Sequence, residues 1–283
     1  MQTFPEHLFV RAGSSSLWLA PVLAGKAEID LLADPDLLFA RPGCELIKDQ
    51  KKIKVARLRL EIGGAARGVY LKRYNVFSWR YRLGSLWLPS GAARSWAGAN
   101  VLLEAGFHTG QPLAAVECRS WGMLTKSFYL SEEIPGSRTA DLHWREELAP
   151  LGGPGGFRRR RSFLKLLAGL FGALHGRSIY HNDLKDANIL VCSGNSGAEE
   201  SFYLLDLEGI RSYRCLNRRR RIKNLVQLHR TFGKLLHGSQ KLYWLRSYLG
   251  EIFRDRKERR QWIRQILSES RRRDRRSLKK SRA

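Results

Sequence analysis

The segment "SIYHNDLKDANILV", residues 178–191, restricts what this chain can fold into more than any other stretch. Both of its ends are apolar, and six polar side chains stand between them: His181, Asn182, Asp183, Lys185, Asp186 and Asn188. Apolar ends of this kind are expected to be buried, which would fix both ends of the loop to the core. The polar side chains would then stand close together, either as a charged turn or as a catalytic site.

The spacing within this loop suits phosphoryl transfer. That reaction needs a cation for the phosphates, oxygen ligands for Mg²⁺ and a base for the acceptor hydroxyl, all held in a rigid frame. Asp183 can accept the proton, Lys185 can reach the transferring phosphate, and Asn188 offers an amide oxygen to Mg²⁺. His181 can brace the loop through the backbone, whereas Asp186 has the character of an ordinary turn residue.

Two residues outside the loop complete this set. Asp206 ends a buried strand in "YLLDLEG", where a carboxylate is costly unless it binds a cation, and Mg²⁺ is held by few carboxylates together with nucleotide phosphates. Lys72 ends the strand "VYLK" and can pair with the α and β phosphates. A lysine on an exposed strand face is common, so a purely structural Lys72 stays open.

The first part of the chain has the pattern of strands. Residues 56–64 and 68–75 alternate between apolar and polar, with glycines between them, which predicts a hairpin. Residues 88–106 show helical spacing and end at a glycine, and residues 111–121 and 124–134 are two more expected strands.

The second part has the pattern of helices, after a break at "GGPGG", residues 152–156. We expect helices at 163–176, 222–236, 241–253 and 260–267, with a small β-ribbon between the first two. The last 13 residues contain eight bases and one acid, which predicts a disordered tail. The expected divisions are residues 1–134, 135–268 and 269–283.

These motifs resemble the protein-kinase-like fold: HxDLKxxN, an aspartate ending the next hairpin, and an earlier strand lysine. Over roughly residues 45–235, the chain is similar to the bacterial lipopolysaccharide core kinases, the Kdo and heptose kinase family. The resemblance implies an α+β fold with two lobes, the first an antiparallel sheet with one helix and the second mainly helical. It also implies ATP- and Mg²⁺-dependent phosphorylation of an inner-core sugar hydroxyl, on the cytoplasmic side of the inner membrane.

The resemblance assigns roles residue by residue. It makes Asp183 the catalytic base and Lys185 the phosphate lysine. Asn188 and Asp206 become the metal ligands, and Lys72 becomes the nucleotide lysine.

Four departures from the protein-kinase pattern bear on this site. The strand lysine normally pairs with a glutamate on the first helix, but no acidic residue lies between Glu61 and Glu104. Glu104 is at the far end of that helix, so either it pairs with Lys72 in a shifted register or Lys72 lacks that partner. Asn182 replaces the arginine that reads a phosphorylated activation loop, so we expect no such switch. Asn224 stands where an acidic brace of the catalytic loop is expected.

The fourth departure is the short segment after Asp206. Only about 15 residues precede the next expected helix, which favours a small or glycolipid acceptor over a peptide. Other kinases of the same fold, and a pseudokinase or nucleic-acid-binding module, remain alternatives; the Asp183, Asn188 and Asp206 set argues against the last two.

The charge of the chain indicates an anionic partner. Lys and Arg outnumber Asp and Glu by 51 to 26, for a net charge of +25. The charge alone does not distinguish phosphate, nucleic acid and a charged lipid surface. The resemblance implies an anionic glycolipid, the lipopolysaccharide core, and an anionic membrane surface rather than nucleic acid. The helix at 260–267, with Trp262, Ile263, Ile266 and Leu267, would attach to that membrane; its alternative is a helix packed on the second lobe. The longest apolar helix candidate is too short to span a bilayer, which predicts a soluble or peripherally bound protein. The resemblance implies that this location is cytoplasmic and peripheral on the inner membrane.

Overall fold

The computed structural model describes residues 7–193 and 200–281. The chain divides into two compact units. Unit 1 comprises residues 1–135 together with 206–209, and unit 2 comprises residues 136–205 and 210–283.

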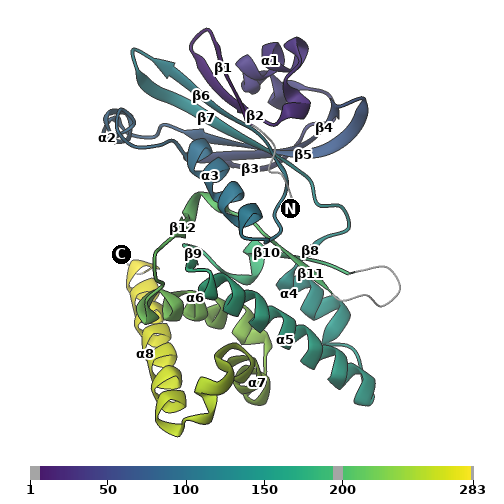
Figure 1. Cartoon of the computed structure of the whole chain (residues 1–283), viewed down its shortest axis with the longest axis vertical. Coiled ribbons are helices and arrows are strands. Elements are labelled where there is room, and N and C mark those ends of the chain that lie inside the picture. Colours follow the sequence, from purple (N-terminus) through teal and green to yellow (C-terminus); the bar gives the residue numbers. More distant parts are fainter. Residues whose placement is uncertain (1–6, 194–199, 282–283) are drawn as a thin grey trace. The chain divides into compact units, whose positions relative to one another are not determined.

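Unit 1 is built on a seven-stranded antiparallel sheet with the order β1-β2-β6-β7-β5-β4-β3 (Figure 1). Its strands are β1 (Leu8–Ala12), β2 (Ser15–Leu19), β3 (Glu45–Gln50), β4 (Ile53–Ile62), β5 (Ala65–Asn75), β6 (Pro112–Ser120) and β7 (Met123–Glu132). The predicted hairpin at 56–75 is confirmed: β4 and β5 pair in continuous register from Ile53 with Tyr74 to Ile62 with Ala65. Gly63 and Gly64 close the turn with φ of 61° and 78°, which glycine adopts without strain.

The alternation of β4 places Leu58, Leu60 and Ile62 on the buried face of the sheet. The helix α1 (Lys26–Ala33) and two 3-10 segments, Pro21–Leu23 and Pro35–Ala40, contribute leucines to the same core. Figure 1 shows α1 and the β1–β2 hairpin together at the top of unit 1.

The long helix of unit 1, α3 (Gly91–Glu104), packs on β5, β6 and β7 (Figure 1). Ser90 caps it by accepting a hydrogen bond from the backbone N–H of Ala93 at 3.0 Å. Gly91 permits a close approach to β5, because a Cβ at this position would collide with the Tyr74 ring. The hydroxyls of Tyr74 and Ser95 then join strand and helix at 2.7 Å. A second helix, α2 (Trp79–Gly84), leads from β5 toward α3.

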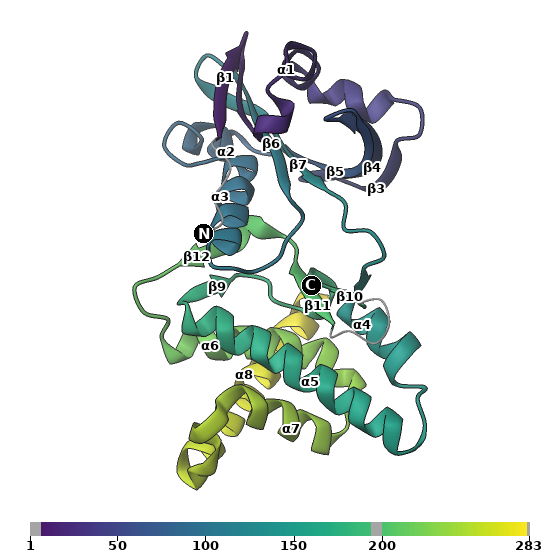
Figure 2. The same ribbon diagram turned by 45° about the vertical axis from the view of Figure 1, so that its right-hand side comes forward.

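Unit 2 is mainly helical, as predicted, with two small sheets (Figure 2). Its helices are α4 (Ala140–His143), α5 (Gly153–Gly176), α6 (Arg218–Arg230), α7 (Gly238–Leu249) and α8 (Arg256–Ser281). Its strands are β8 (Arg138–Thr139), β9 (Ile179–His181), β10 (Ile189–Cys192), β11 (Ser201–Leu204) and β12 (Ile210–Ser212). The buried aromatic rings of Phe163, Phe171, Phe232 and Trp244 form much of the core.

Two elements of unit 2 differ from the prediction. The glycine-rich segment at 152–156 is not a break but the first turn of α5, where Pro154 is tolerated because the first helical N–H groups have no partner in the helix. The α8 helix runs through to Ser281, where composition predicted a disordered tail from residue 269. Glu269 pairs with Arg272 and Arg273, and Asp274 pairs with Arg230 on α6, which offsets the repulsion among the basic residues.

The apolar face of α8 is turned into unit 2. Trp262 is 3% exposed and Ile266 8% exposed, and α8 packs against α6. Attachment to a membrane through Trp262 and Ile266 is therefore excluded, whereas Leu267 is 37% exposed. The helix packs on its own lobe, as the alternative predicted. No helix among the described residues is long and apolar enough to cross a bilayer.

Candidate active site

The polar loop predicted as catalytic lies in unit 2 between β9 and β10. Its apolar ends are buried as expected, with Ile179 3% exposed and Ile189 fully buried. β9 pairs with β12 and β10 pairs with β11, so each end of the loop belongs to a different small sheet. The backbone N–H of Leu205 donates to the carbonyl of Asn188 at 2.9 Å, which fixes the second end further.

Asp183, Lys185 and Asn188 meet at one carboxylate oxygen. Lys185 Nζ lies 2.7 Å from Asp183 Oδ2, and Asn188 Nδ2 donates to the same oxygen at 3.1 Å and to the Asp183 carbonyl at 2.7 Å. The carboxylate remains 41% exposed. Oδ1 of Asp183 and Oδ1 of Asn188 have no hydrogen-bond partner among the described residues, so both can take an outside ligand.

His181 braces the loop through hydrogen bonds with backbone groups, as predicted. Its Nε2 lies 2.8 Å from the carbonyl of Leu205, and its Nδ1 accepts the backbone N–H of Asp183 at 3.1 Å. A carbonyl only accepts and a backbone N–H only donates, so the proton is on Nε2 and the ring is neutral. His181 is only 1% exposed, so water has little access to the two hydrogen bonds of its ring.

Asn224 on α6 is the second brace. It is fully buried, and its Nδ2 donates to the carbonyl of His181 at 2.6 Å and to Oε1 of Gln227 at 2.8 Å. Gln227 Oε1 also accepts the backbone N–H of Leu184 at 3.2 Å. The position therefore supports the loop, as the acidic residue expected there would. The difference is that Asn224 donates to a carbonyl, which a carboxylate cannot do.

A buried chain of hydrogen bonds continues from Asn224 into the core of unit 2. Oδ1 of Asn224 accepts from Nε2 of His175 at 3.1 Å, and Nδ1 of His175 accepts from the hydroxyl of Tyr248 at 2.8 Å. That hydroxyl in turn accepts from Nε of Arg221 at 2.9 Å. Burial lowers the pKa of His175 to about 4, because no anion nearby compensates for the lost hydration of the charged ring. Sequence patterns did not reveal His175 or Tyr248, which lie far from the loop in the chain.

The other half of the predicted site lies in unit 1, where Lys72 of β5 pairs with Asp206. Lys72 Nζ is 2.7 Å from Asp206 Oδ1 and 4.9 Å from the centre of the Tyr74 ring. Burial alone would lower the pKa of Lys72, but Tyr74, Asp206 and Glu208 together raise it above its ordinary value. Lys72 is therefore a permanent cation in this environment.

Asp206 has an unusual backbone. Its φ is 57°, in the left-handed region that non-glycine residues rarely adopt and that costs about 1 kcal/mol or more. The segment after it is short, as predicted: a 3-10 turn (Leu207–Gly209), β12 and five further residues lead to α6. Strain of this kind is retained where the side chain must point in a particular direction.

Glu104 does not pair with Lys72. Its side chain is exposed at the C-terminal end of α3, and no ion pair of Glu104 occurs among the described residues. The first turn of α3 carries Arg94, whose Nη2 lies 3.7 Å from Oε2 of Glu208. Glu208 thus supplies negative charge near Lys72 from the Asp-Leu-Glu motif itself. Nothing in the spacing of the sequence indicated this pair.

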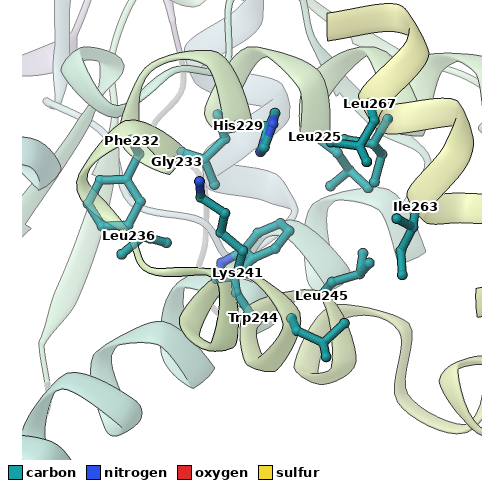
Figure 3. A pocket seen from close by; sticks show the side chains of 14 residues that line it. Leu225, His229, Phe232, Gly233, Leu236, Lys241, Trp244, Leu245, Ile263 and Leu267 are labelled. Atoms are coloured by element: carbon teal, nitrogen blue, oxygen red, sulfur yellow. The ribbon is translucent and has the colours of Figure 1, made fainter.

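Unit 2 also contains an apolar pocket of about 200 Å³ between α6, α7 and α8 (Figure 3). Leu225, Phe232, Trp244, Leu245 and Ile263 are among its walls, and Lys241 is the charged exception among the described residues that line it. Burial lowers the pKa of His229, and the neighbouring Lys241 lowers it further, so the histidine lining the pocket is neutral.

A strand lysine in a β-sheet unit and an HxDxKxxN loop in a helical unit define a kinase-like phosphotransferase. The chain belongs to the lipopolysaccharide kinase (Kdo/WaaP) family, whose sequence profile matches residues 66–248. Its fold is protein-kinase-like, and as a member of this family it is a kinase acting on a sugar hydroxyl.

A solved WaaP structure supports this fold. A structure of WaaP in complex with acyl carrier protein is similar at a TM-score of 0.59 and 22% identity, covering 83% of this chain and 92% of that one. A double mutant of the Mycobacterium tuberculosis PknI kinase domain matches at a TM-score of 0.34 and 16% identity, covering 59% of this chain and 58% of the other. A search of curated protein sequences gives no match.

Proposed function

We propose that this protein transfers the γ-phosphate of ATP, with Mg²⁺, to a sugar hydroxyl of the lipopolysaccharide inner core, on Kdo or heptose. The observation that carries this proposal is the cluster of Asp183, Lys185 and Asn188, held on two buried braces. Unit 1 would bind the nucleotide and unit 2 the acceptor. Family membership supports the same chemistry.

In this proposal Asp183 is the general base. Its Oδ2 is held by Lys185 and Asn188, which leaves Oδ1 to accept the proton of the acceptor hydroxyl. Lys185, 39% exposed, would neutralise charge on the transferring phosphate and release Asp183 as it does so. Lys72 would bind nucleotide phosphates, since its charge is permanent and Asp206 fixes its direction.

The residues present suit Mg²⁺. Hard cations of this kind take oxygen ligands, and Asn188 has an amide oxygen without a partner among the described residues, while the Asp206 carboxylate is 34% exposed. We propose these two residues as the metal ligands. When bound, the ion would neutralise charge on the nucleotide phosphates.

The proposed acceptor is an anionic glycolipid, and the proposed location is the cytoplasmic face of the inner membrane. The surplus of 51 basic over 26 acidic residues supports attraction to such a surface. The short segment between Asp206 and α6 supports a glycolipid acceptor, since it offers little platform for a peptide.

An acceptor screen tests the proposal. Labelled ATP and Mg²⁺ are incubated with Kdo-lipid A, with a heptose-containing core, with casein and with an aminoglycoside, and Asp183→Ala serves as control. We expect label on one glycolipid only, and none with the variant. Label on protein or aminoglycoside instead would identify another kinase of the same fold, and absence of transfer by the wild type would indicate a pseudokinase.

We propose a second role for the apolar pocket of unit 2, binding of an acyl chain. The described lining of the pocket is apolar apart from His229 and Lys241, and the similar WaaP structure is a complex with acyl carrier protein. A fluorescent fatty acid should gain intensity with the wild type and not with Leu245→Trp, which fills the pocket. Equal signals from both proteins would exclude this pocket as the binding site.

A further inference from the structure

Unit 1 exposes a group of large apolar side chains that its fold does not use. Trp79 is 68% exposed, Trp87 79% and Trp121 93%. Three leucines nearby in the chain are also exposed: Leu83 at 44%, Leu86 at 45% and Leu88 at 65%. We call these six residues the tryptophan patch. Single exposed apolar residues are ordinary, but six of this size on adjacent segments mark an interaction surface.

The patch is one surface, although its residues come from two parts of the chain. Five of them lie on α2 and the turns that follow it, and Trp121 lies at the tip of the β6–β7 hairpin. Ser85 joins the two, because its Oγ accepts the backbone N–H of Leu124 at 2.9 Å. Arg119 donates from Nη1 to the carbonyl of Ser85 at 3.1 Å and to that of Gly122 at 2.8 Å. Leu86 lies beside the hairpin tip, with its Cδ2 3.8 Å from where a Cβ of Gly122 would be.

The backbone of Trp121 shows that this residue is not placed for the stability of the unit. Its φ is 53° and that of Gly122 is 75°, so both occupy the left-handed region at the tip of a hairpin. Asparagine and glycine adopt this conformation readily, whereas a bulky side chain does so at a cost. A side chain that is 93% exposed gains no packing energy to offset that cost. The tryptophan therefore serves a contact outside the unit.

The charges around the tryptophan patch indicate which kind of partner it binds. No acidic residue occurs between Glu61 and Glu104, so the whole segment that carries α2 is purely basic. Arg80 lies 5.6 Å from the centre of the Trp79 ring, and Lys52 lies 4.5 Å from that of Phe77, which is itself 40% exposed. Figure 1 shows α2 standing out from the edge of the sheet. The acidic residue paired with Arg119, Glu117, is buried and only 5% exposed. Protruding tryptophans and leucines among arginines suit the interfacial layer of an anionic bilayer.

We propose that the tryptophan patch inserts into the interfacial layer of an anionic membrane and anchors this protein there. The tryptophan rings and leucines would enter the boundary between headgroups and acyl chains, while the exposed Arg80 reaches the lipid phosphates. The inference rests on the proposed membrane location of the kinase and not on its chemistry. It also identifies an attachment surface in place of the apolar face of α8, which is buried.

Vesicle co-sedimentation of the full chain tests the proposal. The vesicles contain phosphatidylglycerol and phosphatidylethanolamine, without nucleotide or acceptor. We expect the triple variant Trp79→Ser, Trp87→Ser, Trp121→Asn to bind at least tenfold more weakly, which corresponds to about 1.4 kcal/mol. The control is Leu37→Ser, Leu46→Ser, Ile47→Ser, which removes three exposed apolar side chains elsewhere in unit 1 (62%, 51% and 51%) and should bind as the wild type does.

Trp121→Asn alone is the variant that preserves the fold, because asparagine suits the turn. It should bind vesicles several-fold more weakly while unfolding no earlier than the wild type. Triple-variant binding equal to that of the wild type would overturn the proposal. The proposal would also be overturned if the wild type did not bind vesicles but self-associated through the patch, as measured by sedimentation velocity. Phosphate transfer to detergent-dispersed glycolipid is measured separately, so that loss of the kinase function and loss of the anchor are distinguishable.

Discussion

Replacement of Asn224 by aspartate tests how the catalytic loop is supported. The substitution restores the acidic residue expected from the protein-kinase pattern, yet we expect it to destabilise this protein. Asn224 donates two hydrogen bonds, to the His181 carbonyl at 2.6 Å and to Gln227 Oε1 at 2.8 Å. A carboxylate only accepts hydrogen bonds, so in both contacts a carboxylate oxygen would face another oxygen. Each buried group left without its partner costs about 1–3 kcal/mol, so the two lost contacts predict a loss of about 2–6 kcal/mol at pH 8.

The same variant should respond differently to acid. In the wild type, the pKa of His175 is about 4 when folded and 6.5 when unfolded, so the unfolded state binds more protons between these values. Stability from this residue is complete above pH 6.5 and is lost as the pH falls, by about 2 kcal/mol at pH 5. In Asn224→Asp the new carboxylate faces Nε2 of His175 and favours the charged ring. The difference in the free energy of unfolding between the wild type and Asn224→Asp should therefore be about 2 kcal/mol smaller at pH 5 than at pH 8.

Urea unfolding at both pH values measures these differences. The matched control is Asn217→Asp, at the N-cap of α6, where the side chain only accepts the backbone N–H of Arg220 at 3.0 Å. Aspartate caps a helix as well as asparagine does, so this control should stay within about 0.5 kcal/mol. An Asn224→Asp protein as stable as the wild type at pH 8, or a difference that does not change with pH, would refute the reasoning.

Three further predictions follow from single contacts. On acidification to pH 5, His175→Gln should lose about 2 kcal/mol less free energy of unfolding than the wild type does, because glutamine can make the same two bonds without titrating. A urea-unfolding profile with the same pH dependence as the wild type would contradict this. Arg94→Met and Glu208→Gln should each raise KM for ATP up to about fivefold, with little effect on kcat, because the partly exposed pair positions Lys72 and is worth about 1 kcal/mol; steady-state kinetics that show a loss in kcat alone would exclude this role. Trp121→Asn should raise the free energy of unfolding by about 0.5–1 kcal/mol by relieving the left-handed backbone, and a lower Tm would show that the side chain stabilises the fold.

The parts of the fold that depend on local patterns were predictable. Alternation marked β4 and β5, and the apolar spacing of residues 163–174 marked the body of α5. The contacts of Asp183, Lys185 and Asn188 also followed from the sequence, because all three stand within one short loop whose ends are buried. Residues that act together and lie close in the sequence have a characteristic spacing that can be recognised.

Contacts between distant segments were not predictable in the same way. The pairing of Lys72 with Asp206 joins residues 134 positions apart, and Arg94 meets Glu208 across a similar separation. Glu104 was considered because it is the first acidic residue on that helix, but its position on α3 points it to solvent. The apolar residues of α8 looked like a membrane face in sequence because an amphipathic helix has the same pattern whether lipid or protein covers it.

The most direct test of the central claim is the product of Asp183→Asn compared with that of the wild type on a defined inner-core glycolipid. Both proteins are given Mg²⁺ and ATP, and mass spectrometry follows the addition of one phosphate. We predict that the wild type phosphorylates a single sugar hydroxyl, and that Asp183→Asn, folded and still able to bind ATP, is slower by at least about 100-fold. A variant that phosphorylates the glycolipid at the wild-type rate would contradict the assignment of this loop as the catalytic site.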